Sequence, residues 1–152
     1  MQKKIVYYGF FTVVVLVLLA LTFNLTSCKK HNPDPDPVTD QDKVRALLVS
    51  GTWKLQSTTV DGVDQTGKFS GFTLKFTATS FTSTNGNPVW PSSGTWAFQG
   101  SSATTIVRND GTVVQLQATA TTLILTLNWA TTTLGPGRIG SIKGKYVFTM
   151  TQ

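Results

Sequence analysis

From residue 53 onward, the chain alternates between apolar and polar residues. Trp53 and Leu55 are each followed by a polar residue, and residues 72–76 repeat the alternation with phenylalanine and leucine. Because successive side chains of a β-strand point to opposite faces, this pattern predicts strands with one buried and one hydrated face. Eight such segments follow one another, near residues 53–55, 72–76, 81–83, 96–98, 106, 114–118, 123–129 and 146–150.

A different spacing precedes the strands. Apolar residues between positions 44 and 48 recur at intervals of three and four, which is the period of one helix face. Thr39 followed three residues later by Asp42 resembles a capping box with aspartate in place of glutamate. We therefore expect one short helix over residues 40–49, ended by Gly51.

The connections between the strands are of two kinds. Three are long, at residues 61–70, 85–93 and 130–144, whereas others, such as Asn109-Asp110-Gly111, are typical of tight hairpins. In an antiparallel meander alternate connections lie at the same end, so the long loops share one end and the helix lies at the other. The pattern predicts an all-β domain, an eight-stranded antiparallel up-and-down barrel with one short N-terminal helix closing one end. A sandwich of two sheets is the alternative.

The first residues have the composition of an export signal. Lys3 and Lys4 precede an apolar run over residues 5–23, and Leu25-Thr26-Ser27-Cys28 follows. This tetrapeptide resembles the lipobox that bacterial lipoprotein signal peptidase recognises. The resemblance implies a signal peptide over residues 1–27 and a lipidated Cys28. The alternative is an uncleaved transmembrane anchor, since about 20 apolar residues suffice to cross a bilayer.

Residues 28–38 are expected to tether the lipid to a folded domain at residues 39–152. Proline alternates with aspartate here, which favours extended backbone. His31 lies in this spacer, where no preorganised geometry supports a metal site. Acyl chains on Cys28 would hold the protein at a membrane. By analogy with lipoprotein sorting, Lys29 favours the outer membrane of the cell envelope, with both its periplasmic and its surface face left open.

Composition excludes several kinds of site. All 7 acidic residues are aspartates, and the chain has one His and one Cys. A single cysteine excludes internal disulfides and cysteine-built metal sites, and the folded domain has no histidine to activate its serines. We therefore expect no enzyme, no metal and no cofactor. The 13 basic residues are scattered without a run, which indicates a solvated surface and no nucleic-acid partner.

Gly51-Thr52-Trp53 lies between the predicted helix and the first strand. It resembles the Gly-x-Trp signature of lipocalins, and residues 44–152 resemble the lipocalin-like domains of bacterial membrane lipoproteins. Residues 85–91, Gly94-Thr95-Trp96 and residues 135–138 carry the same resemblance. It implies that Gly51 permits a tight turn into the first strand and that Trp53 plugs the closed end of the barrel.

The loop-rich end is where a small ligand would find aromatic walls. Alternation predicts four aromatic side chains that point inward toward this end. Trp90 lies on a loop and is either a contact at the barrel mouth or a residue folded over the rim. Arg138, in the last long loop, is a candidate partner for an anionic group. The candidate ligand-binding residues are therefore Phe72, Trp90, Trp96, Trp129, Arg138 and Tyr146.

Two functions fit these features. The first is a membrane-anchored, non-enzymatic lipocalin-like lipoprotein that binds a small apolar or amphiphilic ligand at the loop-rich end of the barrel. The alternative is a filled barrel that acts as a protein or glycan interaction module of the cell envelope. An eight-stranded barrel has the size at which side chains either fill the interior or leave room for one small ligand.

Overall fold

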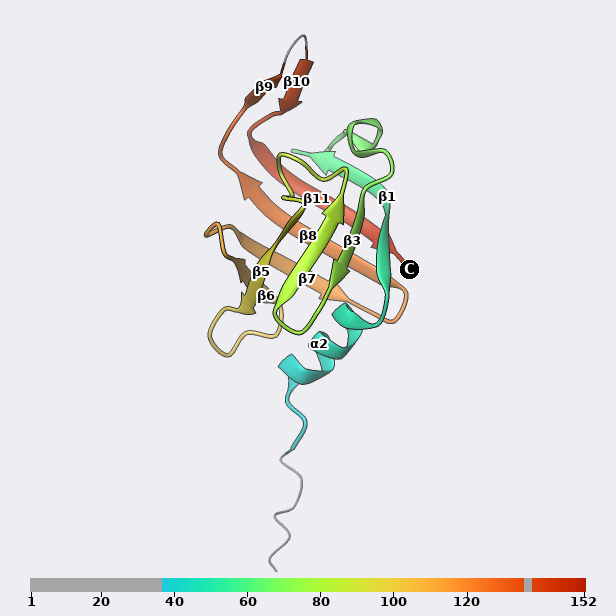
Figure 1. Ribbon diagram of the computed structural model, residues 1–152, viewed down its shortest axis with the longest axis vertical. Coiled ribbons are helices and arrows are strands. Elements are labelled where there is room, and N and C mark those ends of the chain that lie inside the picture. Colours follow the sequence, from blue (N-terminus) through green and yellow to red (C-terminus); the bar gives the residue numbers. More distant parts are fainter. Residues whose placement is uncertain (1–36, 136–137) are drawn as a thin grey trace, which may run out of the picture. The chain divides into compact units, whose positions relative to one another are not determined.

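The computed structural model describes residues 37–135 and 138–152 (Figure 1). The predicted signal peptide, Cys28 and nearly all of the predicted tether lie outside the described residues. No helix within the described ranges is both long and apolar enough to cross a bilayer. The elements are α2 (Asp40–Val49), β1 (Thr52–Val60), β2 (Val63–Asp64), the 3-10 helix η2 (Thr66–Phe69), β3 (Thr73–Phe76), β4 (Ser80–Thr84), β5 (Ser93–Phe98), β6 (Thr105–Arg108), β7 (Val113–Ala118), β8 (Thr122–Trp129), β9 (Thr133–Gly135), β10 (Arg138–Ser141) and β11 (Gly144–Thr151).

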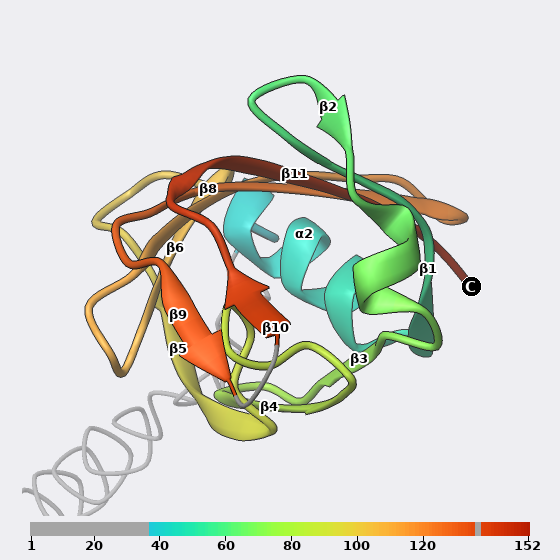
Figure 2. The same ribbon diagram turned by 90° about the horizontal axis from the view of Figure 1, so that it is seen from above.

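Eight of the strands close into an antiparallel barrel. Their order around the ring is β1, β3, β4, β5, β6, β7, β8 and β11, and β11 pairs again with β1. The closing pair runs from Lys54 opposite Thr151 to Val60 opposite Tyr146. Figure 2 shows the strands as a ring around α2 when the molecule is seen from above. The predicted eight-stranded barrel is confirmed, and the sandwich alternative is excluded.

Helix α2 has the predicted bounds and the predicted capping box. The backbone N–H of Asp42 donates to the Thr39 hydroxyl at 3.1 Å, and the Thr39 N–H donates back to the Asp42 carboxylate at 3.0 Å. The helix ends at Val49 as expected, and Ser50 is the C-cap, whose N–H donates to the carbonyl of Leu47 at 3.3 Å. Gly51 lies one residue beyond the cap, at the entry to β1.

The helix closes the end of the barrel that carries the short turns. The Gln41 amide donates to the carbonyls of Gly100 and Ser102 at 2.8 and 3.0 Å, in the turn between β5 and β6. Arg45 donates to the carbonyl of Ala78, in the turn between β3 and β4. Contacts made 33 to 61 residues apart in the chain therefore fix α2 across this end.

The long loops contain short elements that the alternation did not indicate. Asp61 and Gly62 both have positive φ, 48° and 84°, which is the geometry of a tight hairpin turn, and they join β1 to the two-residue strand β2. The last long connection contains the hairpin of β9 and β10. Such short strands escape detection because two to four residues are too few to establish a period.

Candidate functional site

The barrel interior is filled with aromatic rings that touch one another. Ring centroids lie between 5.2 and 6.5 Å apart, at mostly tilted or edge-on angles, which is the preferred arrangement of packed aromatic pairs. Each of these rings is at most 4% exposed. The cluster, hereafter the aromatic core, consists of Phe69, Phe72, Phe76, Phe81, Trp90, Trp96, Tyr146 and Phe148.

Trp53 lies beneath the helix, at the closed end. Its side chain is 0% exposed, and its indole N–H donates to the carbonyl of Leu48 in the last turn of α2 at 3.0 Å. Gly51 lies close to the C-terminus, since a Cβ atom there would come within 3.1 Å of the Gln152 side chain. The Trp53 ring thus ties the helix to the first strand and fills the space between them.

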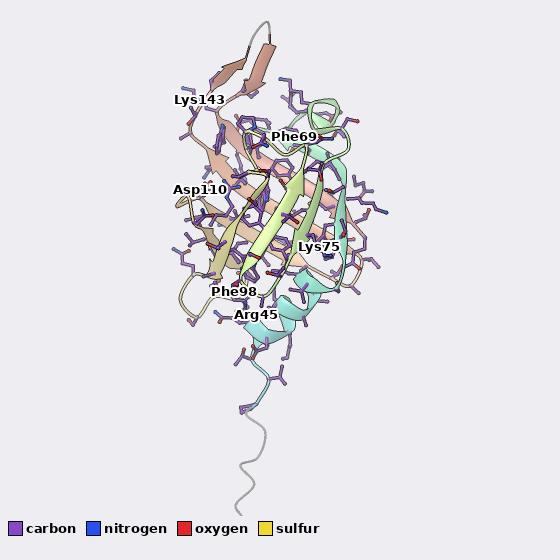
Figure 3. All side chains as sticks on the ribbon, in the orientation of Figure 1. Arg45, Phe69, Lys75, Phe98, Asp110 and Lys143 are labelled. Carbon is purple, nitrogen blue, oxygen red and sulfur yellow. The ribbon has the colours of Figure 1, made fainter. Side chains whose placement is uncertain are left out.

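Trp96 was expected to point toward the loop-rich end, and that expectation is wrong. Its indole N–H donates to the carbonyls of Thr77 and Ser80 at 3.2 Å each, in and beside the short turn between β3 and β4. The guanidinium of Arg45, from α2, lies 5.1 Å from the ring centroid. Figure 3 shows Arg45 and Phe98 at this end, and Phe69 near the other. Alternation predicts which face a side chain occupies, but not which end of the barrel a long side chain reaches.

Trp90 lies on a loop and is nevertheless 0% exposed, so the folded-in alternative holds and an exposed contact at the mouth does not. Its backbone N–H donates to the carbonyl of Gly86 at 2.8 Å, which turns the chain back into the barrel. Gly86 has no space for a side chain, because a Cβ atom there would lie 2.7 Å from Phe72 and 2.8 Å from Trp90. The ring contacts Phe72, Phe76, Phe81 and Phe148 and plugs the loop-rich end.

Arg108 is a buried cation that contradicts the expectation of solvated charges. It is 2% exposed, and its guanidinium lies 4.8 Å from the Trp90 ring centroid. It donates to the Val89 carbonyl at 2.9 Å, to both carboxylate oxygens of Asp110 at 3.2 and 2.5 Å, and to the Thr112 hydroxyl at 3.1 Å. Arg108 therefore fastens the Trp90 loop to the turn between β6 and β7.

Two signals in the sequence point to this arrangement. Arg108 follows Ile106 at an interval of two, which places both side chains on the inner face of β6, and Asp110 follows two residues later.

Partial burial by itself raises the pKa of the Asp110 carboxyl. Hydrogen bonds from the Arg108 guanidinium and the Thr112 backbone outweigh that effect, so the pKa lies below its ordinary value.

Tyr146, Phe72 and Phe69 complete the loop-rich end. The Tyr146 hydroxyl donates to the Ile142 carbonyl at 2.8 Å and accepts the Ile142 N–H at 3.2 Å, and burial raises the pKa of this phenol. Phe72 packs against Trp90 and Phe148. Phe69, from η2, was not among the ligand-binding candidates, and its ring meets Phe148 edge-on at 5.2 Å. Phe72 and Tyr146, which were expected to line a cavity at this end, instead pack against other aromatic rings.

Two polar atoms inside the barrel have no hydrogen-bond partner among the described residues. They are the indole Nε1 of Trp90 and the Oγ1 of Thr58, whose residue is 0% exposed. A buried donor without a partner costs about 1–3 kcal/mol. A hydrogen-bond acceptor inside the barrel would therefore bind most favourably next to one of these two atoms.

The remaining two candidates lie at the rim. Trp129 ends β8, is half-buried and packs against the core. Arg138 begins β10, opposite Gly135 of β9, and its side chain lies outside the described part of the structure. Trp129 and Tyr146 thus belong to the loop-rich end with Phe72 and Trp90, whereas Trp96 belongs to the helix end.

Three adjoining hollows lie on the outer face of the barrel, across β6, β7, β8 and β11. Their volumes are about 600, 350 and 430 Å³. The first two share Gln115 and Thr126, and the first and third share Asn128, Trp129 and Lys145. Since the inward-facing residues of the same strands are buried, these hollows are separate from the aromatic core. We refer to them together as the outer groove.

Within residues 37–135 and 138–152, no three His, Cys, Asp or Glu side chains gather into a possible metal site.

A family model described as a lipocalin-like domain matches residues 49–125, just over half of the chain. No curated protein and no solved structure matches the chain. The matched residues run from the end of α2 through β1 to β7 and into β8, which is most of the closed barrel. On the match and the fold together, the chain belongs to the lipocalin-like domain family.

Proposed function

We propose that this protein is a lipid-anchored, non-enzymatic binding module of a bacterial cell envelope, whose filled barrel recognises its partner on the outside. Lipocalin-like barrels are typically binding domains. The observation that carries the proposal is the aromatic core, which occupies the interior between Trp53 at one end and Trp90 at the other. The chain also has no glutamate, and its one histidine precedes the folded domain.

An interior ligand would first have to displace Trp90. A buried aromatic side chain removes about 200 Å² from water, and at about 25 cal/mol per Å² its exposure costs about 5 kcal/mol. The Arg108 hydrogen bond to Val89 and the contact of its guanidinium with the Trp90 ring oppose the same movement. Outer-surface binding carries neither cost.

The closed sheet restricts how an outside partner binds. Every strand of the ring has two paired neighbours, so the ring itself offers no free edge strand for a partner's strand. Of the three long loops at the loop-rich end, the one at residues 85–92 places Trp90 inside the barrel. The partner is therefore recognised mainly by side chains on the barrel wall and by the loops at 61–70 and 130–143.

Native mass spectrometry tests whether the interior is filled. The whole protein, extracted from its membrane with a detergent that bears no sugar headgroup, is expected to show the mass of the lipidated polypeptide and nothing more. A small molecule retained in one-to-one ratio would contradict the filled barrel. The Trp90→Phe variant serves as the control, because an interior ligand would bind it with altered affinity and an outer one would not.

The anchor is a separate part of the proposal. Lys3, Lys4, the apolar run and the tetrapeptide ending at Cys28 support lipidation, and Lys29 supports the outer membrane. Metabolic labelling with an alkyne analogue of palmitate is expected to mark the wild-type protein and to leave Cys28→Ser unlabelled and unprocessed. Because the chain has one cysteine, a label that survives in this variant would show that Cys28 is not the thioether-linked residue.

A small amphiphilic ligand at the loop-rich end is the second candidate function. The unpartnered Trp90 Nε1 and Thr58 Oγ1 favour it, since a ligand acceptor inside the barrel would satisfy a donor that the protein leaves unpaired. Titration with fatty acids, haem and quinones is then expected to quench the tryptophan fluorescence. If none of the three quenches the fluorescence and the native mass shows no ligand, this second candidate is excluded and the outer-surface binding module is supported.

A further inference from the structure

The Trp90 loop, residues 85–92 between β4 and β5, is a self-contained unit. Inside it the Trp90 N–H donates to the Gly86 carbonyl at 2.8 Å, and at its base the Ser83 N–H donates to the Ser92 carbonyl at 2.8 Å. No other backbone hydrogen bond among the described residues joins this loop to the barrel. The loop can therefore change its position without breaking a strand pairing.

Both ends of the Trp90 loop are suited to act as hinges. Asn85, the first residue after β4, is exposed and has a φ of 57°, and Ser93 begins β5. Residues at the ends of elements absorb the φ and ψ changes of hinge motions. Between these two positions, Pro88 and Pro91 restrict the backbone, which favours movement of the loop as one body.

Arg108 fastens the loop from outside. Its guanidinium donates to the Val89 carbonyl at 2.9 Å and lies 4.8 Å from the centroid of Trp90. Its other partners, Asp110 and Thr112, belong to the turn between β6 and β7 and not to the loop. If the loop swings out, Arg108 keeps these partners and stays with the barrel, so its contacts with the loop act as a latch.

Burial of apolar groups and exposure of polar groups oppose each other in this loop. Val89 and Trp90 are both 0% exposed, which favours the position inside the barrel. The Trp90 Nε1 has no partner there, and the Arg108 guanidinium is kept from water, so both groups would gain hydration if the loop moved out. The indole N–H groups of Trp53 and Trp96, at the helix end, already have carbonyl acceptors and gain nothing from opening.

We propose that the Trp90 loop is a hinged plug, latched by Arg108, that opens as a unit while the eight-stranded ring stays paired. The closed form is the one described above. The open form is the minor one, because Val89 and Trp90 lose their burial in it, and it makes the barrel interior accessible from the loop-rich end. This inference goes beyond the proposed function, which requires only the closed form.

Thiol labelling tests whether the loop opens separately. Val89→Cys places a thiol in the plug, and Val114→Cys places one in the wall of β7; both valines are 0% exposed, so the two substitutions are matched. The full-length protein in detergent is treated with N-ethylmaleimide at increasing urea concentrations below the unfolding transition. Peptide mass spectrometry counts the label at each substituted position, so that a reaction of Cys28 is not included. Circular dichroism first checks that both variants fold.

The thiol of Val89→Cys is expected to react at least about a hundredfold faster than that of Val114→Cys, because it is reached by local opening. Its rate should change little with urea, since local opening exposes little surface, whereas the rate for Val114→Cys should rise steeply. A reagent of this size does not reach a buried thiol through small fluctuations of the packing. Equal rates with equal urea dependence would show that the loop opens only when the barrel unfolds, and would overturn the plug.

The latch is tested by a second substitution in the Val89→Cys background. Arg108→Met is expected to raise the labelling rate at residue 89 about tenfold or more, because the closed form loses the hydrogen bond to Val89 and the contact with Trp90. Arg45→Met is the matched control, since Arg45 makes the same kind of contact with Trp96 at the helix end. It should leave the rate unchanged, because the helix end is the same in both forms. An unchanged rate in Arg108→Met would overturn the latch.

Hydrogen exchange of the indole N–H groups tests the plug without any substitution. In the wild type, exchange at Trp90 is expected to depend weakly on urea and exchange at Trp53 to depend on it steeply. The same steep dependence at both indoles would overturn the plug. These results are independent of the proposed function, which fails instead if native mass spectrometry reveals a small molecule inside the barrel.

Discussion

The two ends of the barrel are closed by the same pair of residue types in different surroundings. At the helix end the guanidinium of Arg45 lies 5.1 Å from the centroid of Trp96, and at the loop-rich end that of Arg108 lies 4.8 Å from the centroid of Trp90. The Trp96 N–H has two carbonyl acceptors, whereas the Trp90 N–H has none among the described residues. Arg45 is half-buried, but Arg108 is buried with a carboxylate partner.

The difference shows what a loop must supply when it replaces a helix. At the helix end, the short turn between β3 and β4 places the carbonyls of Thr77 and Ser80 within hydrogen-bond distance of the Trp96 indole N–H. The folded-in loop at residues 85–92 places its indole deeper, without an acceptor, and depends on the buried Arg108, which is paired with the exposed Asp110, to hold it. The loop-rich end should therefore depend more strongly on its arginine and less on its indole N–H.

The largest expected effect is the loss of either ring. Trp90→Ala and Trp96→Ala are each expected to lower the free energy of unfolding by about 3–5 kcal/mol, because each leaves a cavity the size of an indole. Urea unfolding monitored by circular dichroism measures both. A cost under about 1 kcal/mol for Trp90→Ala would mean that the loop-rich end opens freely in solution, and the contrast between the ends would fail.

The arginines are expected to differ more than the tryptophans. Arg108→Met should cost about 2–3 kcal/mol, because it leaves the Val89 carbonyl unpaired and removes the partner of Asp110. Arg45→Met should cost about 0.5–1 kcal/mol, since this half-buried side chain loses one hydrogen bond and an arginine–aromatic contact. Equal shifts in the urea midpoint of the two variants would contradict the comparison.

Substitution by phenylalanine isolates the indole N–H. Trp96→Phe leaves the carbonyls of Thr77 and Ser80 without this donor, whereas Trp90→Phe removes a donor that had no partner. Both lose similar volume, so Trp90→Phe is expected to cost about 1 kcal/mol less than Trp96→Phe. Thermal unfolding of the two variants side by side measures the difference, and the reverse order would show that the Trp90 N–H is satisfied in solution.

The smallest expected effect is a dependence on pH. The pKa of Asp110 is lowered in the folded protein, so its carboxylate contributes stability above its ordinary pKa of 3.8, and this contribution is lost as the pH falls through the lower, folded-state value. Between about pH 5 and pH 3 the wild type should lose more stability than Asp110→Asn. Parallel pH profiles of the urea midpoint would assign the acid sensitivity to other aspartates, of which Asp40, Asp42 and Asp64 also have lowered pKa values.

The elements of the barrel were predictable because their signals are local. The helix period between residues 44 and 48 and the alternation of each strand need only a few neighbouring residues. The end-to-end asymmetry followed from loop lengths, and the contacts of α2 with the turns at Ala78 and Gly100 agree with it.

The candidate site was less predictable because it depends on packing between distant segments. The burial of Trp90 requires Gly86 to pass beside Phe72, and the burial of Arg108 requires the Trp90 loop above it. The outer groove depends on the register that places Gln115 opposite Thr126, which alternation within a single strand does not specify.

The pairing of β1 with β11 has a consequence for the kinetics of folding. This pairing joins residues such as Lys54 and Thr151, which are nearly a hundred positions apart, so the ring cannot close before β11 has been made. Long-range pairing of this kind slows folding, because the entropy of a large loop is lost before its contacts form. Until β1 and β11 pair, each of them has an unpaired edge, and unpaired strand edges favour aggregation.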